Sequence, residues 1–204
     1  DFGRKFKVSF SGCQEHACGL ASMHDLGLIA VTRTQNGIEQ RGFETYVGGG
    51  LGAVPHQAKL FDEFLPVEEL LPIAQAIARV FARLGEKRNR ARARVKFLVA
   101  QLGLEEFKRV VLEERAKLPD DPRWTSYLSN LSENTEQPIK TFHSDDDPGT
   151  SEYQFWLRTN CYQQRQDGYS VITIALPLGD LTSQQLRQLA QIARTYIGDS
   201  VRLT

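Results

Sequence analysis

The sequence has few cysteines, no net charge and no long apolar run, and each absence excludes a class of protein. Three cysteines in 204 residues are too few, and odd in number, for a disulfide framework, which indicates a reducing compartment and a cytoplasmic protein. Lysine plus arginine total 25, as do aspartate plus glutamate, so the zero net charge argues against a protein that mainly coats nucleic acid or anionic membrane. No apolar run approaches the roughly 18 residues that a membrane-spanning helix needs, and the charged first residues do not resemble a signal peptide.

What is present indicates a folded protein with two parts. Hydrophobic residues make up 41% and charged residues 25% of the chain, as in globular domains. Residues 119–150 are rich in Asp, Ser, Asn and Pro, which predicts a linker between a first domain, 1–118, and a second, 151–204. The chain begins without Met and alternates like a strand at both ends, so we interpret it as a central piece of a longer protein.

The apolar periodicity predicts an α+β protein. In the first part it indicates strands over 4–11, 24–32 and 42–47, with Asn36-Gly37 as a hairpin turn. Helices follow from Pro66, as a first helical residue, to Leu84, and then over 90–102 and 104–117. In the second part we expect strands over 152–160 and 169–179, a helix over 182–196 with Thr182 as its N-cap, and a final strand over 200–204. This order is half or more of a ferredoxin-like sandwich.

Two lysines near the start raise the first functional question. In a strand, Lys5 and Lys7 lie on one face with Ser9 and Ser11, while Phe6, Val8 and Phe10 line the other. The pair can protect a sheet edge from aggregation, or it can bind a small oxyanion between two ammonium groups. Strand geometry does not choose between these interpretations.

Three other groups of residues are candidates for functional chemistry. The glycine run Val47 to Gly52 matches no phosphate-binding motif and serves either close approach to a cofactor, with Gly49 and Gly50 at its centre, or a tight strand exit. The spacing of Cys13, His16, Cys18 and His24 matches no common zinc pattern, so we expect no metal there. The basic run 86–96 suggests a nucleic-acid face, but it lacks interleaved aromatic residues, which favours a solvated or intramolecular basic helix.

Several stretches in order resemble the sulfite and nitrite reductase hemoproteins, which carry siroheme coupled to a [4Fe–4S] cluster. They are RKFKVSFSGC, HDLGLIAV, GFETYVGGGLG, EFLPVEELLPIAQAI, NRARARVKFLVAQLGLEEF and GYSVITIALPLGDLTSQQLRQLAQIA. The resemblance implies that 1–118 is the later part of a first siroheme-domain repeat with a helical extension. It implies that 151–204 opens a second, ferredoxin-like half.

The resemblance also implies a site. Lys5 and Lys7 match the lysines that bind sulfite or nitrite beside siroheme, and Arg4 matches a residue that holds siroheme carboxylates; Gly49 and Gly50 are further candidates for cofactor contact. The implied reaction is six-electron reduction of sulfite to sulfide or of nitrite to ammonia, with ferredoxin or a flavoprotein as electron donor. No nucleic-acid or membrane partner is expected.

The chain also departs from the family pattern. The cluster ligands of the family lie in two cysteine pairs beyond Thr204, and the spacing of Cys13 and Cys18 is one residue longer than that of such a pair. We therefore assign no metal ligand in this chain and expect it to be inactive when isolated. Two alternatives stay open at this stage: a nucleic-acid-binding module that uses residues 86–96, and a ferredoxin-like scaffold domain without chemistry.

Overall fold

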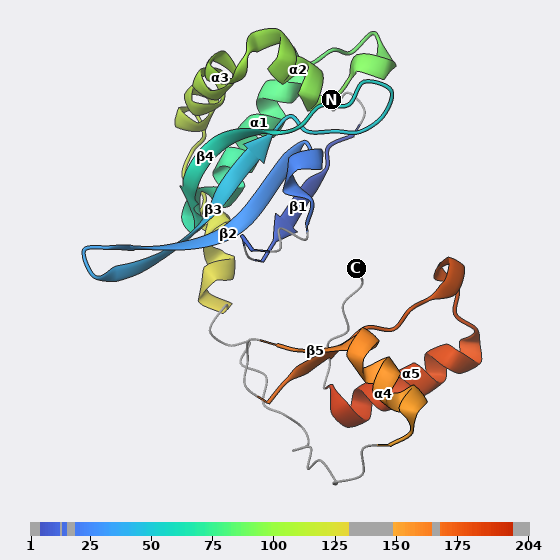
Figure 1. Cartoon of the computed structure of the whole chain (residues 1–204). Helices are drawn as coiled ribbons and strands as arrows, with labels where there is room; N and C mark the ends of the chain where they lie inside the picture. The colour runs from blue at the N-terminus through green and yellow to red at the C-terminus, as the bar shows by residue number, and fades with distance from the viewer. Residues whose placement is uncertain (1–4, 13, 16–18, 131–148, 165–167, 198–204) are drawn as a thin grey trace. The chain divides into compact units, whose positions relative to one another are not determined.

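The computed structural model describes residues 5–12, 14–15, 19–130, 149–164 and 168–197 (Figure 1). The chain divides into two compact units, Asp1–Leu131 and Ser132–Thr204. The division falls within the segment 119–150, while domain limits at 118 and 151 stay predictions. No helix in the described ranges is both long and apolar enough to cross a membrane.

The first unit is built on a four-stranded sheet in the order β1-β2-β3-β4. The strands are β1 (Val8–Ser11), β2 (Leu26–Gln35), β3 (Ile38–Val47) and β4 (Lys59–Pro66). β1 runs parallel to β2, and the other neighbours are antiparallel. Asn36 and Gly37 join β2 to β3 with φ angles of 54° and 77°, as a tight hairpin turn requires, so that prediction is confirmed.

Three helices lie on one face of this sheet (Figure 1). They are α1 (Leu70–Leu84), α2 (Val95–Leu102) and α3 (Leu104–Ala116), with short 3₁₀ turns at Ala21–Met23, Val67–Glu69, Arg90–Arg92, Pro122–Trp124 and Ser126–Asn130. α1 ends at Gly85, as predicted, and Gly103 separates α2 from α3 with a φ of 79°. Pro66, however, ends β4 instead of starting a helix, and β4 itself was not predicted. Its fixed φ suits both positions, so the proline alone does not discriminate.

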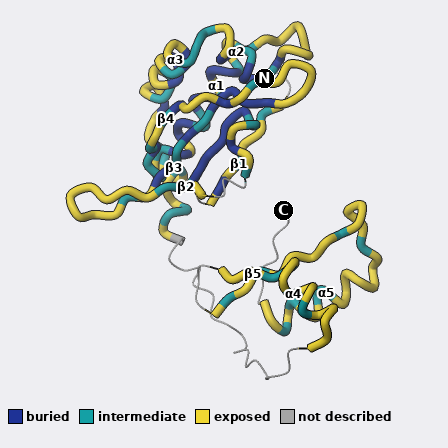
Figure 2. Tube along the Cα trace, viewed as in Figure 1, coloured by how far each residue is buried: buried dark blue, intermediate teal, exposed yellow. Residues whose placement is uncertain are grey.

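The core of the first unit lies between sheet and helices, where Figure 2 shows the buried stretches. The aromatic rings of Phe61 on β4, Phe81 on α1 and Phe107 on α3 are almost fully buried. Burial of such rings is the main source of stability in a domain of this size. The core therefore joins elements from residue 26 to residue 118 into one body.

The first strand differs from its prediction. β1 begins at Val8, so Lys5 and Lys7 precede it. On β1 the face with Ser9 and Ser11 is the more buried one: Val8 and Phe10 are 44% and 54% exposed, whereas Ser11 is buried. Gly19 contacts the end of β1, because its amide donates to Ser11 Oγ at 2.8 Å. This contact helps to cover Ser11, and β1 is an edge strand of the sheet.

The second unit contains α4 (Ser151–Asn160), β5 (Cys161–Gln163), β6 (Ser170–Ile172), a 3₁₀ turn at Pro177–Gly179 and α5 (Ser183–Tyr196). None of its described residues is fully buried. α5 begins at a capping box between Thr182 and Gln185, which confirms the predicted N-cap.

Two strand predictions in this unit were wrong. Residues 152–160 form helix α4, because Thr150 caps the amide of Tyr153 and so favours a helical turn. The strand expected over 169–179 is limited to the three residues of β6. The final strand, 200–204, lies outside the described residues. Helices and strands are nonetheless mixed as an α+β fold requires.

Candidate functional site

Lys5 and Lys7 lie on the segment that enters β1, and both side chains are exposed. Between them, Phe6 is half-buried against the core. The Lys7 backbone is fixed at both ends: its N–H donates to Asp25 Oδ2 at 2.9 Å, and its carbonyl accepts from Leu26 N at 3.1 Å. Neither ammonium forms an ion pair with a carboxylate of the described residues. Arg4, the third predicted cation, lies outside those residues.

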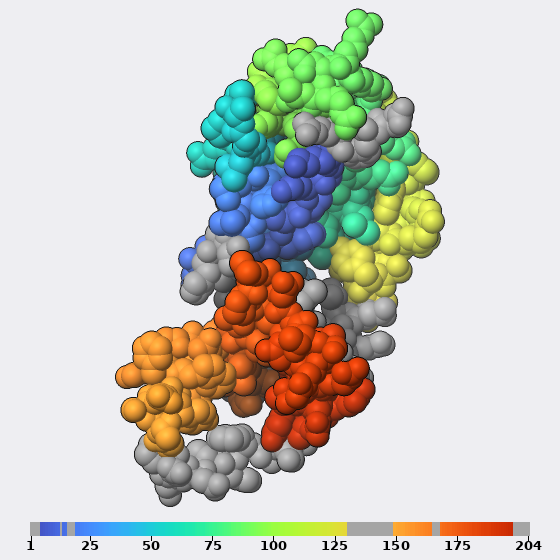
Figure 3. Space-filling model, turned by 90° about the vertical axis from the view of Figure 1, so that its right-hand side faces the viewer, coloured from blue at the N-terminus to red at the C-terminus, as the bar shows by residue number. Residues whose placement is uncertain are grey.

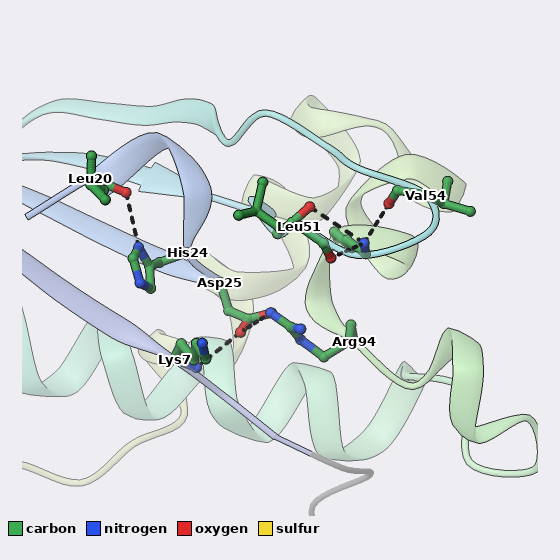
Figure 4. Close-up of polar contacts among 9 residues, drawn as sticks. Lys7, Leu20, His24, Asp25, Leu51, Val54 and Arg94 are labelled. Carbon is green, nitrogen blue, oxygen red and sulfur yellow. Dashed lines mark hydrogen bonds and ion pairs between the residues drawn. The ribbon is translucent and has the colours of Figure 1, made fainter. Parts of the chain in front are cut away.

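Asp25 is the centre of this site, and the sequence reasoning missed it. Its side chain is fully buried, and its two oxygens accept from Arg94 Nε at 3.0 Å and Arg94 Nη2 at 2.7 Å (Figure 4). Its backbone carbonyl accepts from Gly48 N at 3.0 Å. One residue therefore contacts the Lys7 segment, the start of α2 and the glycine loop. Its position directly before the buried strand β2 is the signal that could have identified it, because an unpaired charge is rarely placed there.

Lys96 is a second buried charge at the start of α2. Only 4% of the residue is exposed, and its Nζ donates to the carbonyls of Gly50 at 3.4 Å, Leu51 at 3.1 Å and Val54 (Figure 4). Burial, together with the nearby Arg94 guanidinium, lowers the pKa of Lys96, and Asp25 partly opposes this. The three hydrogen bonds from the Lys96 ammonium hold the loop that follows β3.

The glycine run serves a tight exit from β3. A Cβ at Gly49 would lie 2.6 to 2.8 Å from backbone atoms of Ser22 and His24, and one at Gly50 would lie 3.1 Å from Lys96 Cδ. Their amides are also engaged, since Gly49 N donates to His24 O and Gly50 N to His56 O, each at 2.9 Å. The two N–H groups are thus used within the chain. The Gly50 carbonyl is engaged as well, since it accepts from His56 N at 2.9 Å and from Lys96 Nζ at 3.4 Å. A role of Gly49 and Gly50 in cofactor contact stays a prediction that would involve their Cα atoms.

The candidate metal residues do not form a site in the described part of the chain. Cys13, His16 and Cys18 lie outside it, and His24 Nδ1 lies 2.9 Å from the Leu20 carbonyl (Figure 4). Within the described ranges, no three side chains of His, Cys, Asp or Glu converge as metal ligands would.

The basic run 86–96 divides into two parts. Lys87, Arg88 and Arg92 are exposed, whereas Arg94 and Lys96 point inward to Asp25 and the glycine loop. Figure 3 shows the blue start of the chain, the cyan loop after β3 and the green segment before α2 on one face of the first unit. The run is thus partly intramolecular, but the predicted helix over 90–102 is wrong in its first part, since α2 begins only at Val95. Arg94 is linked to the Lys7 backbone through Asp25.

Two family models match this chain. The model described as "Nitrite and sulphite reductase 4Fe-4S domain" matches residues 1–119, and "Nitrite/Sulfite reductase ferredoxin-like half domain" matches 162–204. The chain belongs to the nitrite and sulphite reductase 4Fe-4S domain family. The resemblance seen in the sequence is thereby confirmed, and the family match includes all of the residues in Figure 4.

Individual relatives agree with this family. The chain is 34% identical over 119 residues to sulfite reductase (ferredoxin) 2 of Mycolicibacterium paratuberculosis, covering 58% of this chain and 20% of that protein. It is 29% identical over 206 residues to the assimilatory ferredoxin-dependent nitrite reductase of Haloferax mediterranei, covering 98% and 32%. The solved structure of the Mycobacterium tuberculosis NirA protein superposes with a TM-score of 0.50 at 34% identity, over 58% of this chain and 21% of that one. The chain thus spans about a fifth to a third of these relatives.

Proposed function

We propose that this chain is part of a siroheme-dependent sulfite or nitrite reductase, in which Lys5 and Lys7 bind the anionic substrate. The observation that carries the proposal is the family match over residues 1–119 combined with two exposed ammonium groups on a segment anchored at Asp25. An oxyanion gains most from charged donors whose backbone is already fixed, because little entropy is then lost on binding.

The described residues fit a carboxylate-bearing tetrapyrrole such as siroheme. Lys5 and Lys7 offer cations that no described carboxylate neutralises, and Lys87, Arg88 and Arg92 add exposed positive charge in the run 86–96. Siroheme, when bound, supplies the iron and the electron transfer of the reaction. Arg4 is proposed to hold its carboxylates.

The described residues do not fit an iron–sulfur cluster. Cys161 is the one cysteine among them, and such clusters are held by several thiolates. No step is therefore assigned to a cluster within the described part of this chain. We propose that its ligands belong to the second repeat, beyond Thr204, as in the family pattern.

The lysines have two tasks in this proposal. Their ammonium groups offset the negative charge of sulfite or nitrite through charge-assisted hydrogen bonds. They also donate protons to oxygen atoms that leave during the six-electron reduction to sulfide or ammonia, which stabilises the departing oxygen. Both tasks require the two Nζ atoms to be held near the reacting anion.

The partners and location belong to the same proposal. Several relatives are named for ferredoxin, which supports ferredoxin as the electron donor, with a flavoprotein as the alternative. The cytoplasmic location rests on the low and odd number of cysteines.

The test uses the complete protein that contains this chain. The purified wild type should show siroheme absorbance and reduce sulfite or nitrite with reduced ferredoxin or a dye. Lys5→Ala and Lys7→Ala should each lower turnover per siroheme by about 100-fold while the absorbance is retained. Lys117→Ala, which alters an exposed lysine after α3, is the matched control. Wild-type turnover in both lysine variants, or a colourless wild type, would refute the proposal.

A further inference from the structure

We propose that Asp25, Arg94 and Lys96 are positioning residues that fix the Lys7 segment and the Gly48–Val54 loop relative to each other. The inference rests on the proposed function, because it gives these buried charges a task at the site of Lys5 and Lys7. None of the three is among the site residues that the sequence predicts.

The first step is the connection between Arg94 and Lys7. The guanidinium forms two nearly parallel bonds to the Asp25 carboxylate, a geometry that fixes the orientation of both groups. The same Oδ2 atom that accepts from Arg94 Nη2 also accepts from the Lys7 amide at 2.9 Å. A rotation of the carboxylate would therefore break the bond that holds Lys7. Arg94 thus acts on the lysine segment without touching it.

The second step is the connection between Lys96 and the glycine loop. Its Nζ is shared by three loop carbonyls, at Gly50, Leu51 and Val54. Three donors on one ammonium fit three acceptors, so the loop is held in one shape. The absence of a side chain at Gly50 matters here, since a Cβ would lie 3.1 Å from Lys96 Cδ and 3.3 Å from Arg94 Nη2.

The placement of these cations argues against a purely stabilising role. Arg94 is the N-cap and Lys96 the second residue of α2, and the positive end of a helix dipole disfavours cations there. Buried ion pairs also add less stability than apolar side chains of equal size, because both charges lose their hydration. Instead, the two cations connect two segments of the site to one helix end. Arg94 holds the Lys7 segment through Asp25, and Lys96 holds the Gly48–Val54 loop.

An experiment can separate the effect of these residues on the position of the Lys7 segment from their effect on the stability of the protein. In the complete protein, Arg94→Lys keeps the charge but loses the bidentate geometry, and Asp25→Asn keeps the shape but loses the charge. Each should raise amide hydrogen exchange at Lys7 by about tenfold and lower kcat/KM per bound siroheme by at least about tenfold. Arg109→Lys, which makes the same change in an exposed bidentate pair with Glu106 on α3, should change neither. Lys96→Met should raise exchange in residues 50–54, with Lys87→Met as its control.

A variant of Asp25 or Arg94 that folds poorly is replaced by the double variant Asp25→Asn with Arg94→Gln, which leaves no unpaired buried charge. Lower siroheme content with unchanged Lys7 exchange and unchanged kcat/KM per siroheme would overturn the inference. Such a result would mean that these residues affect only the stability of the protein. A wild type without siroheme would refute the proposed function instead. The exchange at Lys7 would still decide whether Asp25 and Arg94 hold the segment.

Discussion

Arg94 and Asp25 stand 69 residues apart in the sequence and form a bidentate pair in which the carboxylate is fully buried and 11% of the arginine side chain is exposed. A pair of this kind is costly to break from one side, because the remaining partner keeps a charge with little access to water.

Asp25→Asn should therefore lower the free energy of unfolding by about 3 kcal/mol, measured by urea denaturation. The double variant Asp25→Asn with Arg94→Gln should lose less than the sum of the two single changes, since neither charge is left alone. Arg109→Gln, which removes a pairing with Glu106 and Glu113 on the exposed face of α3, should change stability little, because water screens that pair. Additive losses at Asp25 and Arg94 would contradict the coupling.

Lys96→Met should lower the free energy of unfolding by about 1 to 3 kcal/mol, because three loop carbonyls lose a donor while the apolar stem stays buried. The matched change Lys87→Met, at an exposed position of the same run, should have little effect. Urea denaturation compares the two. Equal stability of both variants would show that the three carbonyls do not depend on the ammonium.

Gly49→Ala should destabilise the first unit by about 1 to 3 kcal/mol, because the new Cβ would meet backbone atoms of Ser22 and His24 at 2.6 to 2.8 Å. These backbone atoms cannot move aside by a change of rotamer, as a side chain can. Gly12→Ala is the control, since no atom lies within 4 Å of a Cβ there. Thermal denaturation of both variants tests this, and a Gly49→Ala protein as stable as Gly12→Ala would contradict the packing described.

Tyr46 should ionise at unusually high pH. A hydrogen bond from its hydroxyl to the Glu44 carboxylate, with burial and the charge of Glu44, raises the pKa of Tyr46 from 10.0 to about 12. Because the folded pKa is the higher one, the associated stability is present below pH 10 and is lost as the pH rises from 10 to about 12. Ultraviolet titration of the wild type against Tyr46→Phe isolates this phenol. A difference titration centred at pH 10 would show that the bond to Glu44 is absent.

Thr182→Ala should loosen the start of α5 in the second unit. The Thr182 hydroxyl accepts from the Gln185 amide at 3.2 Å, and the Gln185 side chain accepts from the Thr182 amide at 2.9 Å. Loss of such a cap costs about 1 kcal/mol, so amide exchange in the first turn should rise about fivefold. Ser183→Ala, one residue later, serves as the control. Unchanged exchange in Thr182→Ala would mean that α5 does not depend on its capping box.

Local signals explain what the sequence predicted correctly. The spacing of apolar residues and the final Gly85 were sufficient for α1, Asn36-Gly37 for the hairpin, and Thr182 for the start of α5. Each depends on residues that are neighbours along the chain. The family resemblance could also be recognised from the sequence, because it rests on several motifs in a fixed order along the chain.

Errors arose where local patterns were compatible with two structures. In residues 152–160, Tyr153, Phe155 and Leu157 alternate as in a strand, but Tyr153, Trp156 and Leu157 also follow helical spacing. The buried face of β1 could not be predicted from the sequence, because both faces carry small or apolar residues. There, Ser11 is buried in a tertiary contact with the Gly19 amide.

By itself the sequence determined the family, the α+β class, the hairpin at Asn36-Gly37 and the capped start of α5, since these depend on motifs and on residues close together along the chain. Only the tertiary structure decided which charges are buried together: Asp25 with Arg94, and Lys96 with the carbonyls after β3. The physical reason is that a buried charge requires a partner at about 3 Å in a fixed direction, and partners from distant segments meet at that distance only after the chain has folded.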